Sequence, residues 1–506
     1  MAILPLFMQA NTSNQKKERL FKFLMLLIIV GGIGLRLVVY LQNRNLIIDE
    51  ANVARNIYER GFIDLVKPLS YEQYAPPLFL WLIKLSSIIF GFSEYALKLY
   101  PFISGIIALY LFYLVLKKLL SPQSIWLPLA LFASGYFFIR YATELKQYNN
   151  DVLVMLALML LALRNNIMTS ESRKFFIIWA IAGSIAIWFS MPSVFVLAGV
   201  GFYYGFQLIR QKELKKLTAL LLASAIWMIQ FLAYYIIILR PQANSNYLQS
   251  FHHDYFLYLT PTSVNEILFN LSRLEILIGT ISGDTVVAVA FLSLTIVAGI
   301  IRLLRKDFNH AVLILTPLAA LMLAAGLKQF SLIPRVSLFG IVLLLILAGY
   351  GFDYLLSISG RVVKMIIILP AIYILSTTLF NTTIEPFKYE ELTEGMQYVI
   401  DKKIPGDYLS LYHSCAPAFI YYTEIHPDKN KWVSLKNADI LKYDTPYGTL
   451  SWQMHYVWSS KGPFAFIFTN ETQEEFAVRR AALDKNLKEA AFLDKPEVKV
   501  LIMQED

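Results

Sequence analysis

Long blocks of apolar residues constrain this chain more than any other feature of its sequence. They run for roughly 17–25 residues with almost no charge, the length that an α-helix needs to cross a hydrocarbon core about 30 Å thick. The composition agrees, because 57% of the residues are hydrophobic and 16% are charged, whereas about a quarter are charged in an average soluble domain. The sequence therefore predicts an α-helical polytopic membrane protein.

We predict about eleven transmembrane helices in this chain. The first is not a cleaved signal peptide, because its apolar run Phe23–Leu41 is too long for one and is not followed by a small-residue cleavage site. A further apolar stretch, 76–91, is shorter and contains Lys84. The predicted spans are 21–41, 99–120, 125–141, 151–164, 174–190, 192–209, 216–239, 284–304, 310–327, 334–357 and 362–380.

Short clusters of Lys and Arg between the spans indicate the orientation of the chain. If the basic N-terminus lies inside and 76–91 does not span, nearly every later cluster falls in a cytoplasmic loop. Counting 76–91 as a span places the same clusters outside, so we expect this segment to lie in, or dip into, the outer interface. The formal charge of +9 is then explained by topology and not by nucleic-acid binding. The clusters lie at 117–118, 164–174, 210–216, 302–306 and 361–364.

This orientation divides the chain into two predicted domains. Residues 1–380 would form the transmembrane domain, with the first outer loop at 42–98 and a later one at 240–283. After residue 380 the composition becomes mixed, and strand patterns alternate with helical ones, which predicts a small extracytoplasmic α/β domain over 381–506. Its only cysteine is Cys415, so no disulfide forms within the chain. Strands are predicted at 407–413, 464–469 and 498–503, and helices at 390–402 and 472–491.

Acidic residues lie where the predicted spans meet the outer surface. Asp49 and Glu50 open the first outer loop, directly after an apolar run. Carboxylates beside hydrocarbon are costly unless they are paired or used. The alternative is that these two only stabilise the start of the next helix through its dipole. Glu144 and Asp151 flank a second outer turn. The four acids are either unrelated or converge at one membrane level, where such groups suit a general base, a metal site or both.

Basic residues on the same side are candidate ligands for a phosphate group. Arg335 begins a late span, Lys328 precedes it by seven residues, and Lys84 lies in the interfacial segment. Arginine suits phosphate because its guanidinium donates two parallel hydrogen bonds. The alternative for each of them is snorkelling to the lipid headgroups. The neighbouring pair His252 and His253 is interpreted as a solvated loop pair, with metal binding or proton transfer as the alternative.

The first outer loop resembles that of the GT-C glycosyltransferases. The branch it most resembles comprises the protein O-mannosyltransferases and the lipid A aminoarabinose transferases of bacterial inner membranes. The likeness rests on Asp49-Glu50-Ala51 after the first span, on Tyr71–Phe79 with its Pro-Pro pair, and on Phe90–Glu94. Pro334–Phe339 is similar to the family's late span that contains an arginine. In some relatives a lysine precedes the second proline, where this chain has Pro76.

The resemblance implies a GT-C fold with interfacial helices in the first outer loop. It also implies the transfer of a hexose or pentose from a polyprenyl-phosphate donor, with inversion, outside the cytoplasmic face of a bacterial inner membrane. The acceptor would be a protein, lipid A or another glycan. The lipid bilayer would be a partner of the chain, and nucleic acid would not.

The resemblance further implies roles for the candidate residues. Asp49 would accept the proton of the acceptor, and Glu50 would support it. Asp151, with Glu144 as its rival, would be the second acidic position, and a divalent metal ion would be held by Asp49 and Asp151 if the reaction uses one. The donor phosphate would meet three basic residues, Arg335, Lys84 and Lys328.

Two other functional classes remain open at this level. A flippase or transporter for a lipid-linked oligosaccharide would place polar residues near mid-membrane, often on broken helices, whereas these spans have few charges at mid-depth. An O-antigen ligase or polymerase relies on arginine and histidine in one large outer loop. The loop 240–283 fits that description, but the Asp-Glu opening of the first loop does not. A monophosphate sugar donor would distinguish the glycosyltransferase from the ligase, which uses a diphosphate oligosaccharide.

Overall fold

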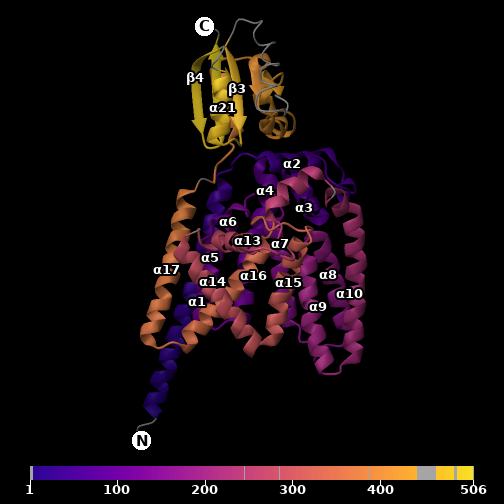
Figure 1. Cartoon of the computed structure of the whole chain (residues 1–506), viewed down its shortest axis with the longest axis vertical. Coiled ribbons are helices and arrows are strands. Elements are labelled where there is room, and N and C mark those ends of the chain that lie inside the picture. The colour runs from indigo at the N-terminus through magenta and orange to yellow at the C-terminus, as the bar shows by residue number, and fades with distance from the viewer. Residues whose placement is uncertain are drawn as a thin grey trace.

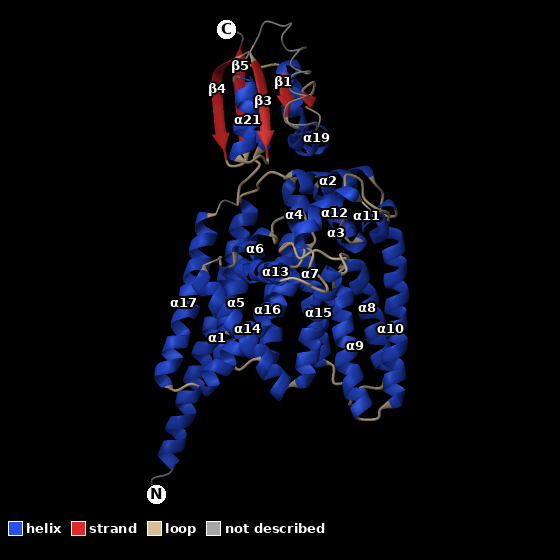
Figure 2. Ribbon diagram, in the orientation of Figure 1, coloured by secondary structure: helices blue, strands red, loops and turns tan. Residues whose placement is uncertain are grey.

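The computed structural model describes residues 4–243, 245–283, 285–385, 387–440, 463–483 and 487–504. Figures 1 and 2 show a bundle of helices with a small sheet domain above it, at the end away from the N-terminus. Among the described residues, nine helices are long and apolar enough to cross a membrane. They are α1 (Leu4–Leu41), α4 (Glu94–Leu119), α8 (Ser172–Phe189), α9 (Ser193–Arg210), α10 (Leu214–Tyr234), α14 (Val286–Lys306), α15 (Phe308–Gly326), α16 (Leu338–Ile358) and α17 (Arg361–Ile384).

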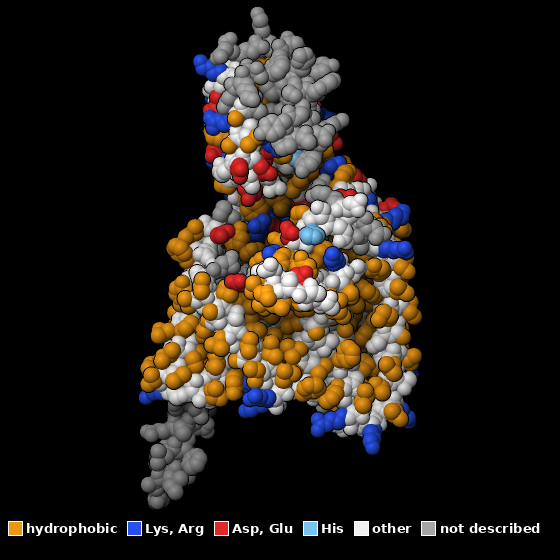
Figure 3. Space-filling model, in the orientation of Figure 1, with side chains coloured by type: hydrophobic (Ala, Val, Ile, Leu, Met, Phe, Trp, Pro, Cys, Tyr) orange, Lys and Arg blue, Asp and Glu red, His pale blue; other side chains and the backbone are white. Residues whose placement is uncertain are grey.

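Two predicted spans form shorter helices. The stretch 125–141 folds as α5 (Trp126–Ser134) and α6 (Tyr136–Arg140), and 151–164 lies within α7 (Tyr148–Arg164), which has 17 residues. Figure 3 shows hydrophobic side chains over the sides of the bundle and Lys and Arg side chains at the end opposite the sheet domain. The predicted polytopic helical fold is confirmed, and the chain is a multi-pass membrane protein.

A buried arginine explains how the bundle tolerates the break between α5 and α6. The guanidinium of Arg36 on α1 donates hydrogen bonds to the backbone oxygens of Phe132 at 3.0 Å and Ala133 at 2.8 Å. These carbonyls lie in the last turn of α5, where intrahelical partners are missing and a cation is favoured. Gly32 allows the close approach, because a Cβ atom there would lie 2.8 Å from the Cβ of Ala133.

The first outer loop contains two short helices that position the site. They are α2 (Ile48–Glu59) and α3 (Pro77–Phe90). With 14 residues, α3 is too short to span a membrane, and it packs against α4. It exposes Ile88, Ile89 and Phe90, as the prediction of an interfacial segment at 76–91 requires.

The second outer segment folds over the turn that precedes α16. It contains α11 (Arg240–Ala243), α12 (Asn246–His252) and α13 (Val264–Ser282). The backbone N–H of Leu332 donates to the carbonyl oxygen of Tyr255 at 3.0 Å. This bond ties the segment to the turn that contains Arg335.

The C-terminal domain is a five-stranded mixed sheet with flanking helices. The strand order is β2-β1-β3-β5-β4, in which β1 is parallel to both of its neighbours and β5 is antiparallel to β3 and β4. The elements are α18 (Leu392–Asp401), β1 (Leu409–Leu411), α19 (Ala416–Ile420), β2 (Asp439–Ile440), β3 (Phe464–Thr469), α21 (Gln473–Leu483), β4 (Lys488–Lys495) and β5 (Val498–Gln504).

Two details of the sequence prediction for this domain are wrong. The predicted helix 472–491 ends at Leu483, and residues from Lys488 onward form β4. Pairing of β4 with β5 overrides the helix propensity of its Lys, Glu and Ala residues. The predicted strand 407–413 shortens to β1, because residues on both sides of it form 3₁₀ turns. The strands predicted at 464–469 and 498–503 agree with β3 and β5.

The C-terminal domain rests directly on α2. Ala54 and Ile57 of α2 share a hydrophobic core with Met396 of α18 and Phe419 of α19. The hydroxyl of Tyr422 accepts a hydrogen bond at 3.0 Å from the backbone N–H of Leu46, two residues before α2. The start of α2 is therefore fixed by both domains.

Candidate active site

A cavity of about 1360 Å³ lies between the outer ends of the helices and the C-terminal domain. Figure 3 shows the surface hollowed below that domain, with acidic, basic and histidine side chains around the hollow. One part of the cavity wall is polar, and the rest is apolar and comes from α9, α10, α15 and the turns beside them. The apolar wall includes Met191, Phe195, Phe231, Leu323 and Phe330. Such a shape fits a lipid with a charged head.

Asp49 lies in the polar part, between two cations. Its Oδ2 atom is 3.7 Å from Lys146 Nζ and 3.6 Å from the guanidinium of Arg335. Gln73 donates to its other oxygen at 3.3 Å and accepts a hydrogen bond from Lys146 at 2.7 Å. Lys146 lowers the pKa of Asp49, and Arg335 adds to this effect against the opposing influence of burial. Asp49 is therefore an ionised carboxylate at neutral pH.

Three further predicted residues line the same cavity: Asp151, Arg335 and Lys328. Asp151 is in the first turn of α7 and is buried. Arg335 lies in the turn before α16, which is closed by a 3.0 Å hydrogen bond from the Ser337 hydroxyl to the Ser331 carbonyl. Tertiary structure thus brings side chains from four separate segments to one place.

The other two predicted acids lie behind the cavity wall. Glu50 accepts hydrogen bonds from Arg44 and from the backbone N–H of Leu145, both at 2.6 Å. Burial by itself would raise the pKa of Glu50, but the charges of Arg44 and Lys98 and the hydrogen bonds from Arg44 and Leu145 together lower it to about 2. Glu144 pairs with Arg140 at 2.8 Å. Glu50 and Glu144 therefore do not line the cavity with Asp49 and Asp151, and both contact Arg44, at 2.6 Å and 3.7 Å.

Lys84 does not reach the cavity, contrary to the prediction. Its ammonium donates to the carbonyl oxygen of Ile57 at 2.7 Å and lies 5.9 Å from the ring of Phe62. Ile57 is in the last turn of α2, where a cation satisfies a free carbonyl group. Lys84 therefore stabilises the C-terminal end of α2, opposite the end that contains Asp49.

Several cavity residues were missed at the sequence level. Lys146 lies in the turn between Glu144 and Asp151, and only the acids of that turn were considered. The position of Lys146 between two candidate acids is the feature of the sequence that could have identified it as a site residue. His252, interpreted as a solvated residue, is half-buried and lines the cavity, while His253 is exposed and does not.

The residues present fit a divalent metal ion poorly. The carboxylate of Asp49 is already balanced by Lys146 and Arg335, and this positive charge opposes a second cation beside it. Among the described residues, no group of three His, Cys, Asp or Glu side chains is arranged to hold a metal ion. We therefore assign Asp49 and Asp151 no metal-dependent step.

The C-terminal domain contributes a carboxylate to the cavity. Glu390, just before α18, lines it and accepts a hydrogen bond from the backbone N–H of Ile48 at 3.2 Å. Burial raises the pKa of Glu390 to about 8, and Glu497, also in the lining, adds to this. The protonation of Glu390 is therefore coupled to the docking of the domain on α2.

Raising the pH should loosen this docking. The pKa of Glu390 is about 8 in the folded protein, against an ordinary value of 4.5. Between these two pH values the folded state keeps the proton and the unfolded state loses it, so the stability of the fold decreases as the pH rises. We expect the melting temperature to fall by about 2–5 °C from about pH 6 to about pH 9. The melting temperature of the Glu390→Gln variant should fall less. That of Glu394→Gln, four residues later in α18 and exposed, should fall as in wild type. Equal slopes for wild type and Glu390→Gln would contradict the assignment.

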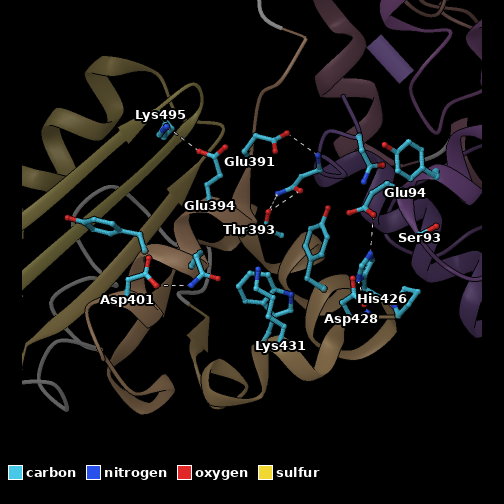
Figure 4. Close-up of a pocket in the computed structure, with 18 of the residues that line it drawn as sticks. Ser93, Glu94, Glu391, Thr393, Glu394, Asp401, His426, Asp428, Lys431 and Lys495 are labelled. Atoms are coloured by element: carbon cyan, nitrogen blue, oxygen red, sulfur yellow. Dashed lines mark hydrogen bonds and ion pairs between the residues drawn. The ribbon is translucent and has the colours of Figure 1, made fainter. Parts of the chain in front are cut away.

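A second cavity of about 780 Å³ lies on another side of α18 (Figure 4). It is lined by the C-terminal domain and by the loops at 43–45 and 93–95. Several of its polar groups are paired with one another: His426 with Glu94 at 3.0 Å, Gln397 with Asp401 at 2.8 Å, and Lys495 with Glu394 at 3.4 Å. None of the predicted site residues lines it. We interpret it as a space left at the interface between the two domains.

The sequence was compared with known families and with curated proteins. Residues 74–237 match the family described as dolichyl-phosphate-mannose-protein mannosyltransferase. No curated protein sequence matches the chain.

Solved structures match over most of the chain. Two crystal structures of ArnT from Cupriavidus metallidurans, one in the apo state and one bound to undecaprenyl phosphate, each align with a TM-score of 0.50 and 13% sequence identity. Each alignment covers 94% of this chain and 97% of ArnT. An oligosaccharyltransferase from Archaeoglobus fulgidus aligns with a TM-score of 0.45 and 14% identity, over 84% of this chain and 60% of that one.

Proposed function

We propose that this chain is a GT-C glycosyltransferase of the PMT-like branch, and that it transfers a sugar from a polyprenyl-phosphate donor to an acceptor hydroxyl or phosphate. The match of residues 74–237 to the mannosyltransferase family and the ArnT-like fold support this proposal. The observation that supports this most is Asp49, placed between Lys146 and Arg335 in a cavity that continues into an apolar wall. The two cations suit a phosphate head, and the apolar wall suits a prenyl tail. The binding of undecaprenyl phosphate by ArnT agrees with such a ligand.

The arrangement suggests how the donor would prepare the base. Without donor, Lys146 and Arg335 both neutralise Asp49. A donor phosphate would compete for these cations, and the carboxylate of Asp49 would become more basic as they turn to the phosphate. Binding of the donor would thus activate the group that deprotonates the acceptor.

The reaction is a single displacement. Asp49 accepts the proton of the acceptor O–H, and the acceptor oxygen attacks the anomeric carbon. The bond from that carbon to the phosphate oxygen breaks, and polyprenyl phosphate leaves with both electrons of the bond. Arg335 and Lys146 stabilise the leaving phosphate, and Lys328 adds positive charge to the same cavity. Attack opposite the leaving group inverts the anomeric centre.

The distribution of charge suggests where the reaction occurs. Lys and Arg side chains lie at the end of the bundle opposite the C-terminal domain, and such clusters face the cytoplasm in most membrane proteins. The cavity would then open outside the cytoplasm, on the periplasmic side of a bacterial inner membrane. Nucleotide sugars are absent there, so a lipid-linked donor is the natural source of the sugar.

A donor comparison tests this function. Purified protein in lipid nanodiscs is given labelled undecaprenyl-phosphate mannose, glucose or galactose, or an undecaprenyl-diphosphate oligosaccharide, with a membrane extract as acceptor. We expect transfer from a monophosphate donor and none from the diphosphate. Transfer from the diphosphate alone would indicate a ligase. Movement of the lipid across the bilayer without transfer, measured with the protein in sealed liposomes, would indicate a flippase.

A further inference from the structure

The side chain of Gln73 connects two charged groups in the polar part of the cavity. It lines the cavity and is 6% exposed. Its Nε2 atom donates hydrogen bonds to Asp49 Oδ1 at 3.3 Å and to the carbonyl oxygen of Tyr71 at 3.2 Å, while its Oε1 atom accepts one from Lys146 Nζ at 2.7 Å. These partners fix the orientation of the amide, because the reverse orientation would place its oxygen against two acceptors and its nitrogen against an ammonium group. Gln73 therefore meets the carboxylate with its donor and the cation with its acceptor.

The backbone of the turn that contains Gln73 has an uncommon conformation. The φ angles of Tyr71 and Glu72 are 64° and 53°, in the left-handed region that residues other than glycine seldom adopt. Such conformations persist only where surrounding contacts hold them, and they cluster at functional sites. The two residues directly before Gln73 thus adopt a costly conformation that sets the direction of its side chain.

Helix α2 provides contacts that hold this turn. The side chain of Asn56 accepts a hydrogen bond from the backbone N–H of Ser70 at 2.9 Å and donates one to the Ser70 carbonyl oxygen at 3.1 Å. Arg55 donates to the hydroxyl of Tyr71 at 2.7 Å, and its guanidinium lies 3.9 Å from the centre of the tyrosine ring. Because the first turn of α2 also contains Asp49, one helix fixes both the carboxylate and the turn beside it.

The distances within this network separate the lysine from the carboxylate. Lys146 Nζ lies 2.7 Å from Gln73 Oε1 but 3.7 Å from Asp49 Oδ2, whereas a direct hydrogen bond between such charged groups is about 2.7–2.9 Å long. The shorter contact is thus with the neutral amide. If the lysine moved onto Asp49, the carboxylate would become a weaker base and the ammonium would be less available to a phosphate.

We propose that Gln73 is a positioning residue, which keeps Lys146 beside Asp49 without letting the two close into a direct ion pair. This rests on the function proposed above and extends it. Gln73 would preserve both groups for the donor, a carboxylate that can take a proton and an ammonium that can turn to the phosphate. Gln73 itself exchanges no proton in the reaction.

A double-mutant cycle measured by binding tests this role. The affinity for undecaprenyl phosphate is titrated in nanodiscs for wild type, Gln73→Met, Asp49→Asn and the double variant. We expect Gln73→Met to weaken binding by about 5- to 20-fold, because Lys146 then closes on Asp49. In the Asp49→Asn background the same change should alter the affinity by less than about 2-fold, because no carboxylate remains to attract the lysine. A general loss of folding would weaken binding in both backgrounds.

Gln230 on α10 provides the matched control. It also joins two side chains, since it donates to the hydroxyl of Ser184 at 2.6 Å and accepts from the indole N–H of Trp188 at 3.1 Å, but it does not line the cavity. Gln230→Met should therefore keep the wild-type affinity, even where its melting temperature falls. Thermal unfolding is measured for every variant, and Gln73→Ala replaces Gln73→Met if the latter does not fold.

Two results would overturn the role of Gln73. One is an unchanged affinity in the folded Gln73→Met variant, and the other is an equal loss of affinity in both backgrounds. Failure of the proposed function is distinguishable, because these affinities do not depend on catalysis. If wild type bound undecaprenyl phosphate but transferred no sugar, the proposed function would be refuted and the titrations would still decide the role of Gln73.

Discussion

Replacing Asp49 by asparagine should lower kcat by about 10²- to 10⁴-fold, the usual contribution of a general base. Asparagine keeps the size of the side chain and the contact with Gln73, but it cannot accept the proton of the acceptor. The same change should tighten the binding of undecaprenyl phosphate, because Lys146 and Arg335 no longer share their charge with a carboxylate. The two effects have opposite signs, which a general loss of folding cannot produce.

Transfer of labelled sugar and titration with undecaprenyl phosphate measure the two effects. Glu50→Gln is the matched control, because Glu50 is the next carboxylate in the chain but is paired with Arg44 behind the cavity. It should lower the melting temperature, as breaking a buried ion pair does, while Asp49→Asn should change it little. Full activity in Asp49→Asn would show that another group removes the proton.

Replacing Arg335 by alanine should weaken the binding of undecaprenyl phosphate by about 10- to 100-fold, since hydrogen bonds to charged groups contribute roughly 1.5–3 kcal/mol. The loss in kcat/KM should be larger, because the phosphate gains negative charge as the sugar leaves. Arg335→Lys should recover part of the affinity and less of the rate, since lysine offers a charge without the two-pronged geometry.

Lys84→Ala is the control for this prediction. Lys84 is a basic residue of the same outer face, but its ammonium binds the end of α2 and not the cavity. Its removal should leave the affinity for undecaprenyl phosphate unchanged. If Lys84→Ala weakened phosphate binding as much as Arg335→Ala, the cavity described here would not be the donor site.

The sequence predicted the class of the protein and the positions of its spans. Length and apolarity of a segment are local properties, and a helix crossing lipid must satisfy its own backbone whatever its neighbours do. The same reasoning placed Asp49, Asp151 and Arg335 at one end of the bundle. The helix predicted over 472–491 failed because strand pairing with β5, a distant contact, decides the structure from Lys488 onward.

Which of these residues share a cavity was decided by tertiary structure alone. Neighbouring residues on a helix point about 100° apart, so Asp49 and Glu50 meet different surroundings, and the chain pattern does not say which of them lines the cavity. The sequence also does not say which of the basic residues face the cavity. Lys84 turns toward α2, and Lys146 reaches Asp49 from a turn about a hundred residues away. Sequence determined the membrane level of each charged group, because burial in lipid is local, whereas the partners of each group depend on how the helices pack.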